Sequence, residues 1–357
     1  GMTKKCIVLD LDNTLWGGII GEDGFEKIQL GPEPPGNAYY EFQKFLRVLK
    51  QQGIILAINS KNNLEDALKV IQEHPYMILK EEDFSCLKIN WSDKVKNLKE
   101  ISKELNIGLD SIVFFDDDKI NCEYVNVSLP QVKVVNLSGD PSFFSEILQN
   151  MNDFDSLKIT NEDLKRTQMY SEQIKRDELK DSSISLNDFL KNLNINVTIK
   201  KSDTFLIPRI SQLMLKTNQF NLTTKRYQEE DIQRLTNDPN FLVGCAQIED
   251  KFGDSGITGV FIVNKKNSNE WYLDSFLLSC RIMGREIEKS FIVYIINEAK
   301  KNNIKKIIAE YIPTQKNKPS KNFLSECGFL KHNDKWIYDV SHSLKLPKFL
   351  SVRVENE

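Results

Sequence analysis

The sequence predicts an α/β protein with two domains, and three observations support this prediction. Short, unbroken apolar runs at residues 7–9, 54–58 and 112–115 are typical of strands that are buried on both faces of a parallel sheet. Helical apolar patterns separate these runs, as in folds where strands and helices alternate. From about residue 240 the pattern changes to an antiparallel strand pair, a third strand and a helix. A chain of 357 residues is long enough for two hydrophobic cores.

Composition excludes several classes of partner and location. The formal net charge is −3 with acidic and basic residues interspersed, so no polybasic tract indicates nucleic acid or an anionic membrane as a partner. No apolar run approaches the roughly 20 residues of a membrane span, and no secretory signal is recognisable, so we expect a cytoplasmic protein. The cysteines have no paired spacing, which favours a reducing compartment. They are Cys6, Cys86, Cys122, Cys245, Cys280 and Cys327.

The first predicted strand brings two carboxylates to its carboxyl end, where open α/β sheets bind ligands. These are Asp10 and Asp12, one residue apart. Two acidic groups so close repel each other unless a cation or a proton lies between them. Mg²⁺ is the expected cation, because it binds carboxylate and phosphate oxygens together. The alternative is a polar turn in which the side chains only satisfy backbone donors.

Further polar residues follow predicted elements in the same way. They are Ser60 after the strand at 54–58, Lys94 before a helical pattern, and Asp116 and Asp117 after the strand at 112–115. Taken alone, Lys94 is equally well an exposed lysine, and the acidic run a solvated loop. In this order, however, the motifs resemble the haloacid dehalogenase (HAD) superfamily of phosphatases and phosphotransferases.

The HAD resemblance implies a role for each of these residues. Asp10 would be the nucleophile that forms an aspartyl phosphate, and Asp12 the general acid that protonates the leaving group and then activates water. Ser60 and Lys94 would hold the phosphoryl oxygens. The other implied residues are Thr14 and Lys61 as substrate-binding groups, and Asp10, Asp12, Asp116 and Asp117 as the Mg²⁺ shell.

Spacing indicates that the HAD-like domain has no large cap. The segment from Asp10 to Ser60 is filled by a glycine-rich hairpin, a helix and a strand, and the segment from Ser60 to Lys94 is shorter still. Relatives insert cap domains in these two places, so we expect an open site. We predict a HAD-like Rossmannoid domain at 2–154 and a helical linker at 155–200.

The second half resembles an α+β domain of the GNAT family of acetyltransferases. Predicted strands at 242–248, 256–263 and 271–278 lead into a loop with Arg281 and Gly284, which precedes a helix. In this family that loop holds the pyrophosphate of coenzyme A through backbone N–H groups. The pattern expects Gly or Ala where this chain has Glu286, whose carboxylate would repel a pyrophosphate. A phosphopantetheine arm lacks that group and fits better. We predict this domain at 201–345.

Several stretches together resemble one narrower family, the FkbH-like proteins of HAD subfamily IIIC. They are residues 10–18, 60–63, 114–117, 216–223, 279–285 and 310–314. This resemblance implies dephosphorylation of 1,3-bisphosphoglycerate and transfer of its glyceryl group, through an enzyme thioester, to an acyl carrier protein for polyketide biosynthesis. Cys280 would carry the thioester, with Arg281 and Arg285 favouring its thiolate and Asn218 binding substrate. The alternative for Cys280 is a buried structural cysteine.

The sequence differs from the FkbH-like pattern at two positions that matter for these implied roles. Many FkbH-like proteins have a cysteine immediately before the serine of the second motif, where this chain has Asn59. Asn121 also stands where the family often has Glu. Phosphatase chemistry tolerates the change at Asn121 comparatively well. Thioester chemistry tolerates the change at Asn59 less well, because that change removes a thiol. Two alternatives therefore stay open: a phosphatase of another phosphorylated metabolite or carrier-bound phosphoester, and a non-catalytic module that binds carrier proteins.

Overall fold

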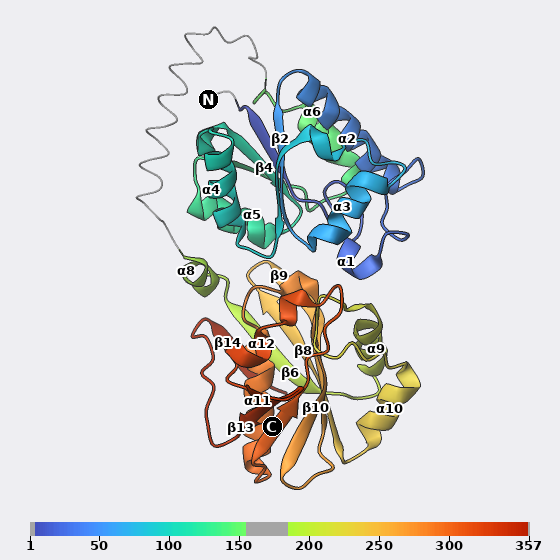
Figure 1. The fold of residues 1–357 in the computed structure, drawn as a ribbon, viewed down its shortest axis with the longest axis vertical. Helices are drawn as coiled ribbons and strands as arrows, with labels where there is room; N and C mark the ends of the chain where they lie inside the picture. Colours follow the sequence, from blue (N-terminus) through green and yellow to red (C-terminus); the bar gives the residue numbers. More distant parts are fainter. Residues whose placement is uncertain (1–3, 155–184, 356–357) are drawn as a thin grey trace. The chain divides into compact units, whose positions relative to one another are not determined.

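The computed structural model describes residues 4–154 and 185–355 (Figure 1). The chain divides into two compact units, Gly1–Leu186 and Asn187–Glu357, each with its own sheet. Most of the predicted linker, from 155 to 184, lies outside the described residues. None of the described helices is long and apolar enough to cross a lipid bilayer.

The N-terminal unit contains a five-stranded sheet in the order β3-β2-β1-β4-β5, with every neighbouring pair parallel. Its strands are β1 (Cys6–Leu9), β2 (Ile55–Lys61), β3 (Phe84–Asn90), β4 (Ile112–Asp116) and β5 (Lys133–Asn136). Its helices are α1 (Ile20–Asp23), α2 (Gly36–Gln51), α3 (Leu64–Glu73), α4 (Lys94–Glu104), α5 (Lys119–Ser128) and α6 (Phe144–Gln149). Helices α2, α3 and α6 lie on one face of the sheet, and α4 and α5 lie on the other (Figure 1).

The central strand is buried because both faces of the sheet are covered. All four residues of β1 are fully buried, and alternate ones, Ile7 and Leu9, pack with Phe42 and Leu46 of α2. Leu9 pairs with Ile58 of β2 and with Phe115 of β4. The residues that follow these three therefore emerge at the same edge of the sheet.

The predicted absence of a large cap is confirmed for the described residues. Between β1 and β2 the chain forms two isolated bridges, the short helix α1 and helix α2. Between β2 and α4 it forms α3, a 3₁₀ turn and β3. The sequence analysis did not predict β3. Polar residues interrupt its apolar ones, so it contains no apolar run, and it lies at an edge of the sheet.

The C-terminal unit contains a mixed nine-stranded sheet in the order β12-β13-β11-β10-β9-β8-β6-β14, with β7 also paired to β10. The strands are β6 (Ile195–Lys201), β7 (Phe220–Asn221), β8 (Phe241–Asp250), β9 (Gly253–Asn264), β10 (Glu270–Leu278), β11 (Lys306–Ala309), β12 (Leu330–His332), β13 (Lys335–Asp339) and β14 (Leu350–Val354). The helices are α8 (Leu186–Lys191), α9 (Ile207–Lys216), α10 (Glu229–Asn237), α11 (Glu288–Lys301) and α12 (Phe323–Glu326).

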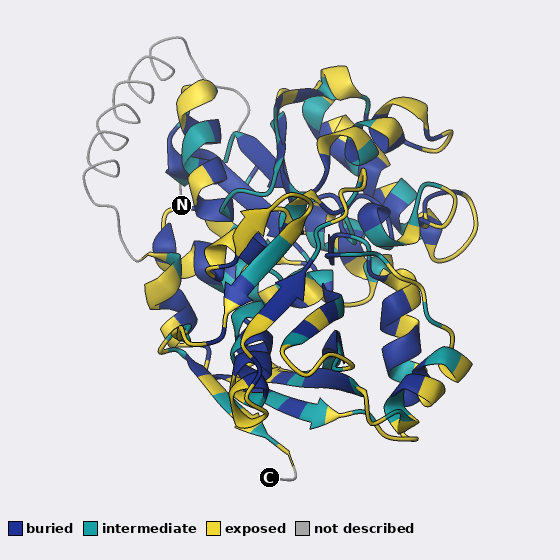
Figure 2. Ribbon diagram, turned by 60° about the horizontal axis from the view of Figure 1, so that its bottom comes forward, coloured by how far each residue is buried: buried dark blue, intermediate teal, exposed yellow. Residues whose placement is uncertain are grey.

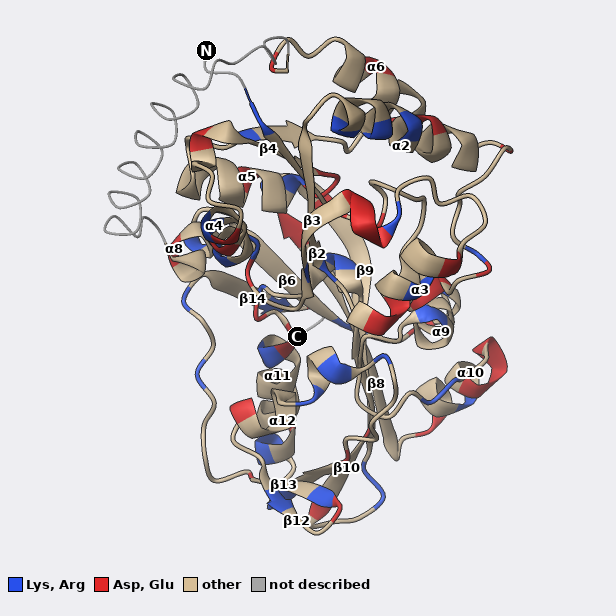
Figure 3. Cartoon of the chain, turned by 45° about the horizontal axis from the view of Figure 1, so that its top comes forward, with Lys and Arg blue, Asp and Glu red and all other residues tan. Residues whose placement is uncertain are grey.

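Helices cover both faces of this sheet as well. Helices α9 and α10 pack through Ile210, Met214 and Ile232 against one face. On the other face, aromatic rings of β9 and β10 meet Phe291 of α11, with centroid separations of 5.8 Å to Phe261 and 5.6 Å to Phe276. Figure 2 shows helices with buried residues on one side and exposed residues on the other, and Figure 3 shows charges of both signs over both units.

Two parts of the domain prediction differ from the structure. Residues 195–200, predicted within a helical linker, form most of β6, because Ile195, Val197 and Ile199 alternate with more exposed residues and so bury one face of a strand. The C-terminal unit also continues past 345, because β14 pairs in parallel with β6. The predicted α/β fold class, with a parallel sheet followed by a mixed sheet, is confirmed.

Gly259 of β9 is expected to be intolerant of a side chain. A Cβ atom there would lie 2.3 Å from Cζ of the buried Phe291, so Gly259→Ala forces the α11 packing to shift. We expect the free energy of unfolding of the C-terminal unit to fall by about 1–3 kcal/mol. Gly139→Ala is the matched control, because a Cβ at Gly139 meets no atom within 4 Å. Urea unfolding measures both, and equal effects of the two changes would contradict the packing described here.

Candidate active site

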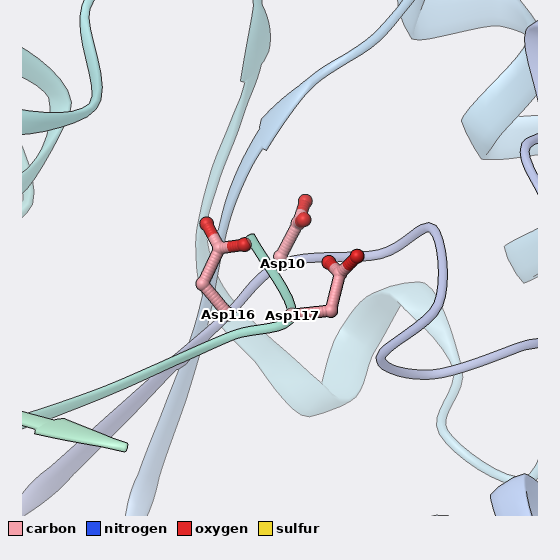
Figure 4. Close-up of side chains that lie close together, drawn as sticks. All are labelled: Asp10, Asp116 and Asp117. Carbon is pink, nitrogen blue, oxygen red and sulfur yellow. The ribbon is translucent and has the colours of Figure 1, made fainter. Parts of the chain in front are cut away.

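Three carboxylates converge at the carboxyl edge of the N-terminal sheet (Figure 4). Asp10 follows β1, Asp116 ends β4, and Asp117 comes next in the chain. One oxygen from each lies within 4.8 Å of the others. Asp116 is fully buried, and the other two are partly exposed to solvent. Clustered carboxylate oxygens are the ligands that Mg²⁺ prefers, so these residues fit a bound Mg²⁺ ion.

Lys94 is the cation that the chain itself supplies to this cluster. It is the first residue of α4, and only 2% of its side chain is exposed. Its Nζ lies 3.3 Å from Asp10 Oδ1 and 3.2 Å from Asp116 Oδ2, and it donates to the backbone oxygen of Asn59 at 2.7 Å. Burial lowers the pKa of Lys94, but the two carboxylates outweigh burial and raise it above its usual value, so the ammonium stays charged.

Burial disfavours the ionised form of the acidic groups in this cluster. Burial raises the pKa of Asp116 to about 7, against the opposing effect of Lys94. Burial, together with the charges of Asp10 and Asp116, raises the pKa of Asp117 well above its usual range. A divalent cation would relieve this repulsion, and this electrostatic demand agrees with the fit of the ligand atoms.

Asp12 is held apart from the carboxylate cluster. Its Oδ1 accepts hydrogen bonds from the indole Nε1 of Trp16 at 3.0 Å and from the backbone N–H of Ile20 at 2.9 Å, and its Oδ2 accepts from Asn62 Nδ2 at 2.9 Å. The prediction that Asp12 contributes a metal ligand is therefore not matched by its side chain. Burial raises the pKa of Asp12 to about 7, although these hydrogen bonds partly offset that effect. A carboxyl group with such a pKa is suited to acid and base catalysis near neutral pH.

The other predicted substrate-binding residues of this unit differ in how accessible they are. Ser60 at the end of β2 is 1% exposed, and Thr14 is completely buried with an Oγ1 that has no hydrogen-bond partner among the described residues. Lys61 is partly exposed. Burial and the charge of Lys94 lower the pKa of Lys61, which places its ammonium in the field of the same site.

Asn59, which stands where many FkbH-like proteins have cysteine, has a structural role here. It is fully buried, its Nδ2 donates to the backbone oxygen of Lys94 at 3.0 Å, and its Oδ1 accepts from Asn97 Nδ2 at 3.1 Å. Both ends of its amide are thus used to hold α4 against β2. The sequence analysis missed this function and that of Asn62, although both lie in the polar run at 59–63.

The remaining candidates lie in the C-terminal unit, directly after β10. Cys280 begins a 3₁₀ turn and is partly exposed, whereas the other five cysteines, all within the described ranges, are buried. Arg281 is exposed. Arg285 instead forms a buried ion pair with Asp250 at 3.1 Å and donates to the backbone oxygen of Arg281 at 2.8 Å. Its guanidinium therefore braces the loop against the β8–β9 turn.

One residue of the loop after Cys280 has a backbone conformation that usually favours glycine, at the position where the GNAT pattern has Gly or Ala. Glu286 has a φ of 57°, in the left-handed region that favours glycine. Its carboxylate pairs with Lys289 Nζ at 2.6 Å in the first turn of α11. An acidic side chain thus occupies the end of the helix where an anion would otherwise bind.

The predicted motif at 216–223 lies beside this loop. Phe220 and Asn221 form β7, which pairs with Leu278 and Leu277 at the end of β10. Asn221 is fully buried, and its backbone oxygen accepts from Asn317 Nδ2 at 2.9 Å. Asn218 accepts a hydrogen bond from the guanidinium of Arg226. These contacts hold β7 beside the last two residues of β10, which Ser279 and Cys280 follow in the chain.

Arg209 of α9 was not predicted. Its Nε donates to the backbone oxygen of Ile257 at 3.2 Å, and the neighbouring Thr258 accepts from the backbone N–H of Ser279 at 2.7 Å. Burial and the nearby charge of Arg281 lower the pKa of Arg209. The guanidinium of Arg209 thus lies in the electrostatic field of Arg281, the residue that follows Cys280, and only the folded sheet brings the two arginines together.

The chain is similar to several solved structures. No protein-family model and no curated protein matches the chain. The N-terminal part of protein BF1531 from Bacteroides fragilis, which contains a phosphatase domain and was solved with Mg, is 42% identical, with a TM-score of 0.43. The match covers 44% of this chain and 43% of that chain, so this chain spans less than half the length of that relative. The parallel five-stranded sheet, with its carboxylates at one edge, agrees with the predicted resemblance of the N-terminal unit to HAD-type phosphatases.

GNAT structures match the C-terminal part at low identity. A GNAT acetyltransferase from Staphylococcus aureus is 15% identical, with coverage of 40% of this chain and 99% of that one and a TM-score of 0.33. One from Desulfovibrio desulfuricans is 10% identical, with the same coverage and a TM-score of 0.34. The mixed sheet with helices on both faces agrees with the predicted α+β domain.

In the metal-free protein, Asp116 is expected to lower stability as the pH rises. Its folded-state pKa of about 7 exceeds the ordinary value of 3.8, so the folded state holds the proton more tightly and the free energy of unfolding falls across this window. Asp116→Asn removes this dependence. Between about pH 5 and about pH 8, we expect the variant to lose about 1–3 kcal/mol less than wild type. Urea unfolding in EDTA measures the difference, and identical pH dependence in both proteins would refute it.

Proposed function

We propose that the N-terminal unit is a Mg²⁺-dependent phosphatase or phosphotransferase with Asp10 as its nucleophile. The observation that supports this most directly is the cluster of Asp10, Asp116 and Asp117 with the buried Lys94 at one sheet edge. The relative from Bacteroides fragilis supports it as well, since its matching part contains a phosphatase domain and was solved with Mg. Bound Mg²⁺, held by the three carboxylates, would offset the negative charge of the phosphoryl group.

The geometry assigns a part in two successive steps to each residue. Oδ1 of Asp10 is held by the N–H of Leu11 at 2.8 Å and by Lys94, so we assign attack on phosphorus to Oδ2. The new bond joins this oxygen to phosphorus, the bond to the leaving oxygen breaks, and Asp12 gives that oxygen a proton. Water then attacks the aspartyl phosphate, Asp12 takes up its proton, and inorganic phosphate leaves. Ser60 and Lys94 hold phosphoryl oxygens throughout.

Phosphate release should depend on both Mg²⁺ and Asp10. We expect EDTA-treated protein to be inactive on 4-nitrophenyl phosphate and acetyl phosphate until Mg²⁺ is added, because the single positive charge of Lys94 does not offset three carboxylates and a phosphoryl group. Asp10→Asn should lower kcat/KM by about 10³-fold or more, since it removes the nucleophile. Asp140→Asn serves as the control. Asp140 is exposed and accepts the backbone N–H of Ser142, and asparagine keeps a side-chain oxygen that can accept the same hydrogen bond. Metal-independent release, or full activity of Asp10→Asn, would exclude this mechanism.

For the whole chain, we propose that dephosphorylation is coupled to transfer of a glyceryl group from 1,3-bisphosphoglycerate to an acyl carrier protein. Cys280 is the cysteine best placed to form a thioester, because it is partly exposed and is followed in the chain by Arg281, whose charge would favour the thiolate. Its thiolate sulfur would attack the acyl carbon, so that the bond from this carbon to the phosphate oxygen breaks and inorganic phosphate leaves. The Asp10 site would then hydrolyse the remaining phosphoester. The carrier's phosphopantetheine thiol would then take the acyl group.

One observation favours a carrier-bound phosphopantetheine arm over free coenzyme A, and a second one bears on where the thioester forms. Glu286 and its ion pair with Lys289 occupy the start of α11, where a pyrophosphate would meet a carboxylate. Asn59, with both ends of its amide bonded to α4, leaves no thiol at the second motif, so a thioester has to form elsewhere. Cys280 satisfies that requirement.

Intact-protein mass tests this coupling. After incubation with Mg²⁺ and 1,3-bisphosphoglycerate, we expect an adduct of glyceryl size on wild type, no adduct on Cys280→Ala, and transfer to added acyl carrier protein. Cys245→Ala is the matched control, since that thiol is buried. Phosphate release with no adduct would leave the alternative of a phosphatase with another substrate. Carrier binding with neither reaction would leave a non-catalytic module.

A further inference from the structure

We propose that Asn62 is a positioning residue that aims the acidic proton of Asp12 at the leaving group, an inference that rests on the phosphatase function proposed above. Asn62 is 1% exposed and follows β2. Its Nδ2 lies 2.9 Å from Asp12 Oδ2 and 3.4 Å from Ser60 Oγ. One amide nitrogen therefore joins the general acid to a group that holds the phosphoryl oxygens.

The direction of the amide follows from its neighbours. Asp12 Oδ2 is a carboxylate oxygen and accepts hydrogen bonds when ionised, so the group 2.9 Å from it has to be the donor NH₂. A flipped amide would place two oxygens against each other at that distance. The contact thus fixes Asn62 in one orientation.

The hydrogen bonds to Asp12 distinguish its two oxygens. Oδ1 already accepts from Trp16 Nε1 and from the N–H of Ile20, so its lone pairs are occupied. Oδ2 accepts only from Asn62 among the described residues. Because one lone pair of Oδ2 points at the amide, the other is left for the catalytic proton. Trp16 and Ile20 thereby leave Oδ2 as the oxygen that carries the proton, and Asn62 sets the direction in which that proton points.

The same amide orients Ser60. When Ser60 Oγ accepts from Asn62, its own hydrogen is free to donate to a phosphoryl oxygen. In the step itself, the bond from phosphorus to the leaving oxygen breaks while the proton passes from Asp12 Oδ2 to that oxygen. Asn62 forms no bond to the substrate and exchanges no proton.

The energetics agree with a functional role. The Oδ1 of Asn62 is buried and has no hydrogen-bond partner among the described residues. An unsatisfied buried polar atom is destabilising, because it gives up its hydrogen bonds to water without gaining others. A side chain that only stabilised the loop would gain little from such an arrangement, whereas one that holds a catalytic carboxyl group justifies it.

The test compares leaving groups. Ethyl phosphate needs a proton on its leaving oxygen, whereas 4-nitrophenyl phosphate needs one much less. We expect Asn62→Ala to lower kcat/KM about 10–100-fold for ethyl phosphate and at most about threefold for 4-nitrophenyl phosphate. Asp12→Asn should show the same graded loss, and adding Asn62→Ala to Asp12→Asn should change kcat/KM no further, within about twofold.

Controls separate this role from folding and from metal binding. Asn63→Ala is the matched variant, because Asn63 lies in the same loop but bonds to Trp91 and Asp66 rather than to Asp12. Asn62→Ser provides a second variant with a side chain too short to span the distance to Asp12. Circular dichroism and stabilisation by Mg²⁺ should be unchanged in each, since Asn62 lies outside the carboxylate cluster.

Each outcome of these measurements either supports or contradicts the proposed role of Asn62. A loss that is equal for both leaving groups, no loss at all, or an additive effect with Asp12→Asn would overturn the role of Asn62 and leave the phosphatase function intact. A wild-type protein that hydrolyses neither compound with Mg²⁺ would overturn the proposed function and this inference with it. Graded and non-additive losses establish Asn62 as the residue that positions Asp12.

Discussion

The ammonium of Lys94, buried between Asp10 and Asp116, is the contact on which the N-terminal unit depends. Breaking a buried ion pair by removing one partner typically costs about 3–5 kcal/mol, because the other charge stays buried. The fold therefore fixes where α4 begins. Asp93 accepts the N–H of Val95 at 2.7 Å, and its other oxygen accepts from the hydroxyl of Tyr124 at 2.6 Å. The helix start, and with it Lys94, is held from two sides.

The register of the parallel strands positions the other residues of the site. Because Leu9 pairs with Ile58 and Phe115, the polar residues that follow emerge together without a long loop. The C-terminal unit uses its buried polar groups differently. Arg285 and Asp250 form an internal brace, and Asn221 and Asn317 hold β7 beside β10. These contacts shape the loop that presents Cys280 and leave Arg281 exposed.

Sequence patterns predicted what depends on local chemistry. The strands β1, β2 and β4, whose central residues are buried, appear as apolar runs, and the motif residues Asp10 and Lys94 come together as the HAD resemblance implies. What depends on partners far along the chain was missed. Edge strand β3 has a mixed pattern, and the two residues of β7 are too few to form one.

The same limit applies within the site. Asn62 and Asn59 belong to one polar run, and nothing in that run indicates that one amide bonds to Asp12 and the other to α4. The direction of a side chain at a strand end is set by its tertiary neighbours. Arg209 is a further case, since only the alignment of Ile257 beside the end of β10 brings it towards Arg281.

The central claim is that Asp10 forms a covalent phosphoenzyme in a Mg²⁺-dependent cluster. The measurement that tests it most directly is peptide mapping by mass spectrometry, after wild type is incubated with Mg²⁺ and acetyl phosphate and quenched in acid. We expect the mass of one phosphoryl group on the peptide that contains Asp10, and none in EDTA or in Asp10→Asn. A phosphoryl group on another residue, or one that forms without Mg²⁺, would contradict the account.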